Sequence, residues 1–376
     1  MPNIKTVVTA CDLVTAYGKG ALFCWEGILS SKSAIGKVER FSTVSFQSKN
    51  AAVVAGLKYF GDDSLLMQMF ISLLKRNKDL IPQDALLILA TTTGEIDILE
   101  QHVLEGVGDA KESGFSFLLE KVKALTGIMG ESAIISSACA SSSAALGFAS
   151  SLIQSGKSDC VLVVAADAVT EFVFSGFSSL MALDPDNAKP FDKNRAGLSL
   201  GEGAGFVLLM SQARAQQEGR TILGEIAGWA VSGDANHMTG PSRDGSGLKL
   251  AIQKALRSAG VSSDDVGCIS SHGTGTVYND AMEMKAYKSV FENRPVPLYS
   301  IKGAVGHTMG ASGLIETIIA LRVLEKRIIP PTVGLIDVDP EAKDWASRES
   351  RALAKSAILL NNAGFGGVNA ALVLKQ

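Results

Sequence analysis

The chain has 376 residues, of which 19% are charged and 47% are hydrophobic, and its formal net charge is −3. This composition excludes an intrinsically disordered protein, because disorder requires low hydrophobicity and high net charge. The length allows two or three domains of ordinary size, or two halves fused into one globule. No cluster of Lys and Arg is present to meet nucleic-acid phosphates, so a nucleic-acid-binding protein is disfavoured.

No stretch of the sequence is predicted to span a membrane. The longest charge-free segment, residues 132–156, contains nine serines and is interpreted as a buried helix. The first ten residues lack the apolar core and cleavage site of a signal peptide. The five cysteines are an odd number without CxxC spacing, which argues against a disulfide framework and against a zinc site. Together these features predict a cytoplasmic protein without a membrane span.

Short apolar runs typical of β-strands recur along the chain. They lie at residues 6–9, 85–90, 133–135, 160–166, 205–210, 222–231, 268–270, 297–301, 356–360 and 370–374. Segments with the apolar spacing of helices separate most of them, at residues 63–76, 141–155, 247–259, 280–290 and 311–325. This alternation predicts an α/β fold with largely buried strands.

Two parts of the chain share one pattern, in which a strand run precedes a helix rich in small residues. The first such run ends at Cys139, and the second ends near Lys302 and His307. Each part then closes with a Gly-rich turn that leads into a strand. We therefore predict a duplicated unit with its boundary near residue 220, which divides the chain into residues 1–220 and 221–376.

Cys139 lies in the segment SSACASSSAALGFA, at the predicted start of a helix. Unpaired backbone N–H groups and the helix dipole lower the pKa of a thiol in such a place and favour the nucleophilic thiolate. A lone cysteine is also a common small hydrophobic residue in protein cores. From this segment alone, both interpretations stay open.

Two of the four histidines lie in Gly-rich turns between a strand and a helix. His272, in SHGTGT, is an acid/base candidate or a hydrogen-bonded structural residue, and His307 follows Lys302 in KGAVGHTMGASG. The hydroxyls of Thr274 and Thr276 are potential partners for an amide-bearing ligand. The remaining two are His102, predicted on a solvated acidic helix, and His237, which is either at the mouth of a site or structural.

The C-terminal segment NNAGFGGVN contains glycines on both sides of Phe365. Such glycines allow backbone N–H groups to converge, which is how an oxyanion hole is built. The alternative is a tight turn before the last strand, and the glycines alone leave both open.

In this order the motifs resemble those of the elongating β-ketoacyl-acyl-carrier-protein synthases, condensing enzymes with the thiolase fold. The resemblance covers nearly the whole chain and rests on ACASSS, PFDKNRAGLSLGEGAG, HGTGT, KGAVGHTMGASG and GFGG. It implies an α/β, five-layered αβαβα fold built from two similar halves. The first half would carry the nucleophilic cysteine, the second would carry both catalytic histidines, and the protein would form a dimer.

The resemblance also implies roles for individual residues. Cys139 would hold the acyl group as a thioester, and the backbone N–H groups of Cys139 and Phe365 would form the oxyanion hole. His272 and His307 would assist decarboxylation of a malonyl extender and stabilise the enolate oxygen. Phe365 would also gate the acyl pocket by rotating as the chain enters.

A second set of residues would support this chemistry. Lys302 would order the histidine region through three carboxylates, those of Asp280, Glu283 and Glu316. Thr274 and Thr276 would hydrogen-bond the pantetheine amides. The resemblance implies no metal and no separate cofactor, because the substrates are carried on the phosphopantetheine of an acyl carrier protein.

The sequence departs from the family where a basic surface for an acidic carrier protein is expected. Residues 56–69 retain only Lys58, beside Asp62 and Asp63. Docking would therefore be weak, or it would use other basic residues or those of a partner subunit. The alternatives within this chain are Lys189, Lys193 and Arg195.

Related enzymes are distinguished by single residues. A degradative thiolase would place a second catalytic cysteine where this chain has Phe365, and an initiating synthase would use one histidine and an asparagine. The expected function is decarboxylative condensation in fatty-acid, polyene or polyketide synthesis. The rival hypothesis is a synthase-like subunit that shapes or assembles with an active partner, as a homodimer or heterodimer. The acyl-chain length depends on pocket residues, for which 91–94 and 174–177 are the candidates.

Overall fold

Eleven strands form the main sheet of the computed structural model, which describes residues 4–376, and ten of them follow one another in a single hydrogen-bonded order. In chain order these ten are β1 (Thr6–Thr15), β5 (Leu86–Ala90), β6 (Ser132–Ile135), β7 (Cys160–Asp167), β9 (Gly203–Ser211), β10 (Gly224–Gly233), β11 (Val266–Ser270), β12 (Leu298–Tyr299), β15 (Ala357–Gly364) and β16 (Val368–Lys375). Each of the ten apolar runs predicted from the sequence overlaps one of them, so the predicted strands are confirmed.

The same strand order occurs twice along the chain. The sheet runs β6-β5-β7-β9-β1 and then β10-β16-β15-β11-β12. When the strands of each half are numbered in chain order, both halves read 3-2-4-5-1 from the outer edge of the sheet toward the contact between β1 and β10. The pairing also repeats, since strands 2, 3 and 4 are parallel and strand 5 is antiparallel to its neighbours. The protein is thus built from two similar halves; the boundary near residue 220 stays a prediction.

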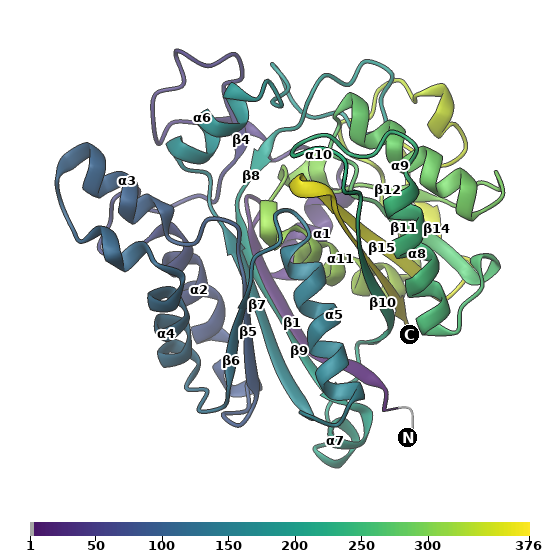
Figure 1. Cartoon of the computed structure of the whole chain (residues 1–376), viewed down its shortest axis with the longest axis horizontal. Coiled ribbons are helices and arrows are strands. Elements are labelled where there is room, and N and C mark those ends of the chain that lie inside the picture. The colour runs from purple at the N-terminus through teal and green to yellow at the C-terminus, as the bar shows by residue number, and fades with distance from the viewer. Residues whose placement is uncertain (1–3) are drawn as a thin grey trace.

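The helices cover both halves of the sheet and fill the space between them (Figure 1). Their bounds are α1 (Ala21–Leu29), α2 (Leu65–Arg76), α3 (Ile96–Glu105), α4 (Phe115–Thr126), α5 (Ser141–Gln154), α6 (Glu171–Ser179), α7 (Gln212–Gln217), α8 (Ser246–Ala259), α9 (Val277–Val290), α10 (Lys302–Val305) and α11 (Ser312–Lys326). Helix α2 packs on the first half-sheet, α8 packs on the second, and α5 and α11 contact both. The result is the predicted five-layered αβαβα arrangement.

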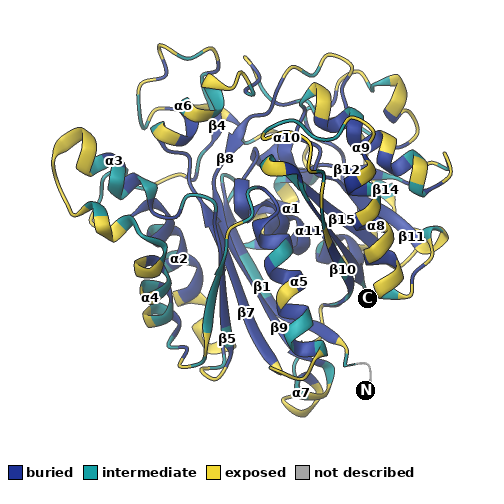
Figure 2. Ribbon diagram, in the orientation of Figure 1, coloured by how far each residue is buried: buried dark blue, intermediate teal, exposed yellow. Residues whose placement is uncertain are grey.

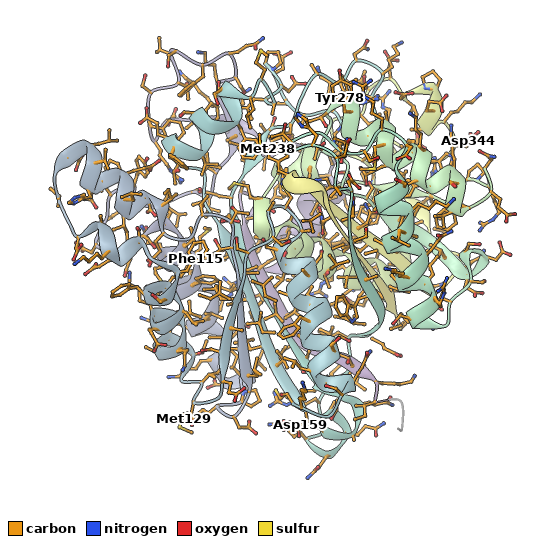
Figure 3. All side chains as sticks on the ribbon, in the orientation of Figure 1. Phe115, Met129, Asp159, Met238, Tyr278 and Asp344 are labelled. Atoms are coloured by element: carbon orange, nitrogen blue, oxygen red, sulfur yellow. The ribbon has the colours of Figure 1, made fainter. Side chains whose placement is uncertain are left out.

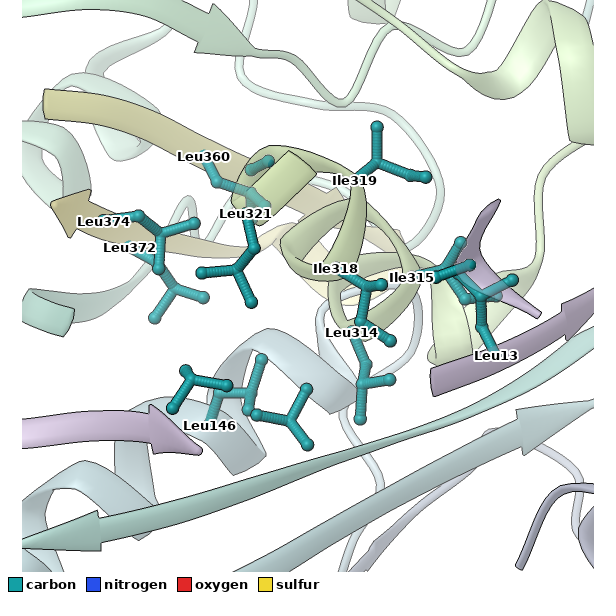
Figure 4. Close-up of a cluster of buried hydrophobic side chains, with 14 of the residues drawn as sticks. Leu13, Leu146, Leu314, Ile315, Ile318, Ile319, Leu321, Leu360, Leu372 and Leu374 are labelled. Atoms are coloured by element: carbon teal, nitrogen blue, oxygen red, sulfur yellow. The ribbon is translucent and has the colours of Figure 1, made fainter. Parts of the chain in front are cut away.

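The core has one layer of apolar side chains on each face of each half-sheet. Along β9, Val207 and Leu209 join the cluster around α5 and α11, whereas Phe206, Leu208 and Met210 join the cluster beneath α2 and α4. The central cluster brings together residues of α5, α11 and both half-sheets (Figure 4). Because helices cover both faces, most of the strands read as continuous apolar runs rather than alternating ones, and Figure 2 shows them largely buried.

Small residues let the two central helices lie close together. A Cβ added at Gly313 of α11 would lie 2.0 Å from Oγ of Ser143 on α5, and one at Gly147 would lie 2.3 Å from the ring of Trp229. The charge-free segment 132–156 supplies β6 and α5; α5 is largely buried, as predicted, whereas β6 is half-buried. Among residues 4–376, no helix has both the length and the apolarity required to cross a bilayer.

Short strands complete the structure; of these, β2 belongs to the main sheet and the others lie outside it. They are β2 (Gly18–Lys19), which pairs with β1, the three-stranded group of β3 (Gly36–Lys37), β4 (Asn50–Ala52) and β8 (Leu200–Gly201), and the pair β13 (Ile328–Ile329) and β14 (Arg351–Ala352). Strand β8 also bridges to the loop of His307 through Leu200. This bridge connects the first half of the chain to a predicted site residue of the second.

Candidate active site

Three predicted site residues lie just beyond the carboxyl ends of parallel strands. Cys139 follows β6, His272 follows β11, and His307 follows β12 and the short helix α10. Their sulfur and ring nitrogen atoms lie within 4.8 Å of one another, and the two imidazole centroids are 5.2 Å apart. The fold therefore joins one residue of the first half to two of the second, as the sequence predicted.

Cys139 is 7% exposed and lies two residues before the start of α5. It follows Ala138, whose φ of 46° is in the left-handed region. Burial raises the pKa of the thiol to about 11, although Lys302 and backbone hydrogen bonds act in the opposite direction. The expectation of a lowered thiol pKa is therefore wrong, because loss of hydration outweighs the helix terminus.

Backbone N–H groups converge on the sulfur of Cys139. The backbone N–H groups of Phe365 and of Cys139 itself act on it and lower the pKa of the thiol. The close approach of the two segments favours glycine at position 364, since a Cβ there would lie 3.1 Å from the backbone nitrogen of Cys139. The geometry thus brings together the two donors expected for an oxyanion hole.

Local hydrogen bonds fix the protonation pattern of His307. Its Nδ1 accepts the backbone N–H of Met309 at 3.1 Å and lies 3.1 Å from the hydroxyl of Ser312. A neutral imidazole that accepts at Nδ1 carries its proton on Nε2. Burial, followed by the charge of Lys302, holds the pKa of His307 well below its usual value. The ring is therefore a neutral N–H donor at neutral pH.

His272 is also a neutral N–H donor, but a different contact fixes its protonation pattern. The side-chain nitrogen of Asn362 lies 3.4 Å from Nδ1 of His272 and donates toward it. Burial, then the charge of Lys302 and the neighbouring His307, keep the pKa of His272 well below its usual value. Both imidazoles thus present a neutral Nε2–H group, which suits donation to an oxygen that gains negative charge.

Lys302 forms one of the buried ion pairs of the protein. Its ammonium hydrogen-bonds Glu316 and donates to the carbonyl oxygen of His272 at 2.5 Å. The other oxygen of Glu316 accepts from Asn362 at 2.7 Å. The resemblance implied that Lys302 acts on the histidine region through three carboxylates. In the structure it contacts one of them, that of Glu316.

The other two carboxylates, those of Glu283 and Asp280, hold the turn of His272 by separate contacts. Glu283 accepts the backbone N–H groups of His272 at 2.8 Å and Gly273 at 2.7 Å. Asp280 accepts the N–H of Gly275 in this turn at 3.2 Å and the N–H of Phe191 at 2.8 Å. The expected link from Lys302 to Asp280 and Glu283 is wrong, because backbone N–H groups occupy these carboxylates.

A cavity of about 590 Å³ opens from Cys139 to the surface. Thr274 and Thr276 line it, with their hydroxyl oxygens 2.9 Å apart. Phe365 also lines it and stacks on Phe177, with ring centroids 5.7 Å apart. These contacts place the predicted pantetheine-binding residues and the predicted gate on one cavity.

Not every candidate pocket residue lies on this cavity. Phe177 lines it, but residues 91–94 do not. The hydroxyl of Thr91 and the N–H of Thr92 instead hydrogen-bond to Asp167, at 2.7 and 3.0 Å. The loop 91–94 therefore has a structural contact where the sequence suggested a pocket wall.

The proposed docking residues differ in their availability. The side chain of Arg195 is 8% exposed and forms ion pairs with Asp339 and Asp280. Because its charge is already neutralised, the prediction that Arg195 is a docking residue is wrong. Lys193 is half exposed but lies 3.2 Å from Asp337. Lys189 is half-buried and Lys58 is exposed.

The two remaining histidines lie apart from the buried pair. His102 is exposed on α3, where its Nδ1 lies 2.9 Å from the carbonyl of Gly108. His237 lines the cavity, and of its two open interpretations the structure favours the mouth of the site. Cys139, His272 and His307 would also suit Zn²⁺ as a ligand set, and they are the only such cluster found among residues 4–376.

Asp167 and Asn362 were missed as functional candidates. Asp167 ends the apolar run of β7, and this isolated acid at a strand end was the available signal. It is fully buried and accepts the N–H of Gly310, at 2.7 Å, in the loop of His307. Asn362 accepts the hydroxyl of Ser143 and so links α5 to the histidine network.

Comparison with known proteins gives the same assignment for most of the chain. Residues 116–215 match the family described as Beta-ketoacyl synthase, N-terminal domain, and residues 223–335 match Beta-ketoacyl synthase, C-terminal domain. The chain is 31% identical to 3-oxoacyl-[acyl-carrier-protein] synthase 2 of Synechocystis sp., with 99% of this chain and 98% of that protein covered. The same-named protein of Vibrio cholerae is 29% identical, with both chains covered completely. The protein belongs to the β-ketoacyl synthase family.

Solved structures share the fold over the full length. The ishigamide ketosynthase/chain length factor superimposes with a TM-score of 0.89 at 28% identity, covering 100% of this chain and 99% of the other. A type II PKS acyl-carrier protein in complex with its ketosynthase, AntDE:AntF, gives a TM-score of 0.90 at 26% identity, with 99% of each chain covered. The thiolase-like ketosynthase fold therefore extends over both halves.

Proposed function

We propose that the protein is a β-ketoacyl-[acyl-carrier-protein] synthase, an acyltransferase that performs decarboxylative Claisen condensation. The observation that carries the proposal is the buried cluster of Cys139, His272 and His307, whose sulfur and ring nitrogen atoms lie within 4.8 Å of one another. A thiol that can bear an acyl group thus lies beside two neutral N–H donors. The names of the relatives, 3-oxoacyl-[acyl-carrier-protein] synthase 2, support this function.

The first half-reaction loads the nucleophile. The sulfur of Cys139 attacks the carbonyl carbon of an acyl thioester, and the arm departs as a thiol that carries the proton once held by Cys139. The tetrahedral oxyanion forms near the N–H groups of Cys139 and Phe365, which donate to it as negative charge develops. Phe365 rotates against Phe177 to admit the acyl chain.

The second half-reaction extends the chain by two carbons. A malonyl thioester loses carbon dioxide, and the electron pair of the broken bond forms an enolate. The Nε2–H groups of His272 and His307 stabilise the enolate oxygen because neutral donors avoid the desolvation cost of buried imidazolium ions. The enolate carbon attacks the acyl thioester, and Cys139 leaves as a thiolate that takes up a proton.

The supporting residues position this machinery. Glu316 and Lys302 hold His272 through Asn362 and through the backbone carbonyl of His272. Thr274 and Thr276 receive the amides of the phosphopantetheine arm, which carries the substrates without a separate cofactor.

We assign residues 1–220 and 221–376 to the two thiolase-like halves.

All five cysteines are free, which supports the reducing cytoplasm as the compartment.

A second candidate function is a synthase-like subunit that shapes the pocket of an active partner. The similarity to a ketosynthase/chain length factor structure favours a paired assembly. The retained Cys139 favours activity in this chain. A homodimer and a heterodimer with another synthase-like chain are both compatible with the fold.

The test is condensation by the purified chain, with an acyl thioester of a carrier protein and malonyl carrier protein as substrates. We expect carbon dioxide release and a β-ketoacyl product from the wild type, and no acyl-enzyme from Cys139→Ala. Condensation that survives Cys139→Ala would contradict the mechanism. Activity that requires a second synthase-like chain would support the subunit function instead.

A further inference from the structure

One side chain stands out at the outer end of the cavity. Of the described residues that line it, Arg243 is the only Lys or Arg. Arg243 is exposed and lies in the segment between β10 and α8. Within residues 4–376, its guanidinium has no carboxylate at ion-pair distance.

The carboxylates next to Arg243 in the chain are already engaged. Asp234 accepts the backbone N–H of Ser242 at 2.8 Å and the amide of Asn369 at 2.7 Å. Asp244 accepts the hydroxyl of Ser242 at 2.6 Å and the N–H of Ser246 at 3.0 Å. The positive charge of Arg243 is therefore available to interact with a group outside this segment.

The guanidinium is held in place although it is exposed. Its central carbon lies 5.6 Å from the centroid of the Tyr278 ring, a cation–π contact. The ammonium of Lys285 donates to the carbonyl of Arg243 at 2.9 Å, which anchors the backbone. Tyr278, at the start of α9, is 64% exposed, and Figure 3 shows it at the rim of the molecule. An anion would thus meet a cation whose position is already restricted.

A second donor lines the same cavity. Nδ1 of His237 accepts the backbone N–H groups of Thr239 at 3.1 Å and Gly240 at 3.0 Å. By the same argument as for His307, the neutral ring carries its proton on Nε2. Both donors lie in the segment that leads from β10 to α8.

The chain between His272 and Tyr278 connects the buried site to this rim. His272 and Thr274 are buried, Thr276 is half-buried, and Tyr278 is exposed. A thioester arm with its reactive end at Cys139 would therefore pass the threonine hydroxyls and end beside Arg243. The outer end of a phosphopantetheine arm is a phosphodiester, and an arginine fork matches its oxygens in geometry and charge.

We propose that Arg243, held by Tyr278 and assisted by the Nε2–H of His237, binds the phosphodiester of the phosphopantetheine arm. This inference rests on the proposed function and assigns a further residue to its substrate. It makes Arg243 a substrate-binding residue outside the reacting atoms. The contact compensates in part for the scarcity of free basic residues on the predicted docking surface.

The experiment compares malonyl-pantetheine, malonyl-phosphopantetheine and malonyl carrier protein as extenders for the acylated enzyme. For the wild type we expect a lower KM with the phosphorylated arm than with the unphosphorylated one. Arg243→Ala should raise KM about tenfold for malonyl-phosphopantetheine, the size typical of one charge-assisted contact, and leave malonyl-pantetheine unchanged. Arg243→Lys should recover part of the effect, and kcat should stay the same in all cases.

Two further variants serve as comparisons. Tyr278→Leu removes the cation–π contact and should raise KM for the phosphorylated arm by a smaller factor. Arg257→Ala removes an exposed arginine of α8 that does not line the cavity and should change no constant.

Equal KM effects of Arg243→Ala on both small arms would overturn the proposal. So would an effect seen only with the carrier protein, since Arg243 would then contact the carrier itself. Failure of the wild type with every extender would instead contradict the proposed function.

Discussion

The carboxylate of Asp167 accepts the backbone N–H of Gly310 at 2.7 Å. Asp167 ends β7 in the first half of the chain, and Gly310 lies three residues after His307 in the second half. The same carboxylate receives the N–H of Thr92 and the hydroxyl of Thr91. One buried acid thus positions the loop of His307 against the half that carries Cys139.

Replacement of Asp167 should weaken both the fold and catalysis. Asp167→Asn keeps the shape, but its amide nitrogen faces backbone N–H groups and leaves donors unpaired. We expect the free energy of unfolding to fall by about 1–3 kcal/mol, the cost of an unsatisfied buried group. The loop of His307 should shift, so kcat should fall while KM for the acyl thioester stays similar. Denaturant unfolding and steady-state kinetics would measure the two effects.

Thr91→Val is the matched control for this prediction, because it removes one hydrogen bond to the same carboxylate, together with the bond that the hydroxyl accepts from the N–H of Gly94. It should cost about 1 kcal/mol of stability and leave kcat nearly unchanged. Wild-type stability and kcat in Asp167→Asn would show that the link between the halves has no role.

The reactivity of Cys139 should increase steeply with pH. Its pKa is raised to about 11, mainly by burial, so the thiol form dominates at neutral pH and the thiolate fraction rises tenfold per pH unit. The rate of iodoacetamide modification, followed by mass spectrometry of the intact chain, should rise in parallel between pH 7 and 10. Cys24 and Cys268 are fully buried and should react more slowly. A rate at Cys139 that levels off below pH 8 would contradict the raised pKa.

The two buried histidines should make the protein less stable in acid. Their pKa values lie well below the usual 6.5, mainly because of burial, so below pH 6.5 the unfolded chain binds more protons at these positions. The free energy of unfolding contributed by each histidine is present above pH 6.5 and falls as the pH decreases.

A comparison with His307→Asn isolates this contribution. Between pH 6.5 and pH 5, the wild type should lose up to about 2 kcal/mol more than the variant, since one pH unit corresponds to 1.36 kcal/mol per group. Asp97 and Asp280 act in the opposite direction, because their pKa values are raised to about 6, but they are common to both proteins. Parallel pH curves would contradict a lowered pKa of His307.

The contact between the central helices should tolerate no additional methyl group. A Cβ at Gly313 would overlap Oγ of Ser143 at 2.0 Å and Oδ1 of Asn362 at 2.5 Å. We expect Gly313→Ala to destabilise the protein by about 1–3 kcal/mol, as overpacking of a core does. It should also lower kcat, because Asn362 contacts His272. Thermal unfolding and condensation rates would measure the change.

Gly176 offers the control substitution in a helix with free space. It lies in α6, and nothing lies within 4 Å of an added Cβ. Gly176→Ala should therefore be neutral or slightly stabilising, since alanine is the better helix former by about 1 kcal/mol. Equal stability of the Gly176→Ala and Gly313→Ala proteins would refute the close-packing argument.

Metal ions should inhibit the enzyme rather than support it. The sulfur of Cys139 and the two imidazoles form a set that Zn²⁺ accepts. Zn²⁺ should therefore compete with acylation, and EDTA should restore the rate. In the absence of added metal, EDTA should leave condensation unchanged. Loss of activity in EDTA that Zn²⁺ restores would contradict a metal-free mechanism.

The sequence determined most of the sheet and the identity of the three central residues. Strands buried on both faces require apolar runs, and such runs marked ten of the eleven strands of the main sheet, all except the two-residue β2. Helices α1, α4, α6, α7 and α10 lie outside the predicted helical segments. In α1 the exposed face is apolar as well, with Leu22 and Phe23 exposed, so the helical periodicity is weak. Cys139, His272 and His307 were found because each lies in a turn of small residues, in motifs that resemble those of the family.

Only the tertiary structure decided how these residues are tuned and which charges are free. Burial reversed the expected shift of the Cys139 thiol pKa, and Asp339 removed Arg195 from the docking surface. Asp167 and Asn362 gained roles through partners that lie more than a hundred residues away in the sequence, such as Gly310 and Ser143. Hydration and hydrogen-bond partners depend on which segments lie side by side in the fold, and the local sequence does not specify those contacts.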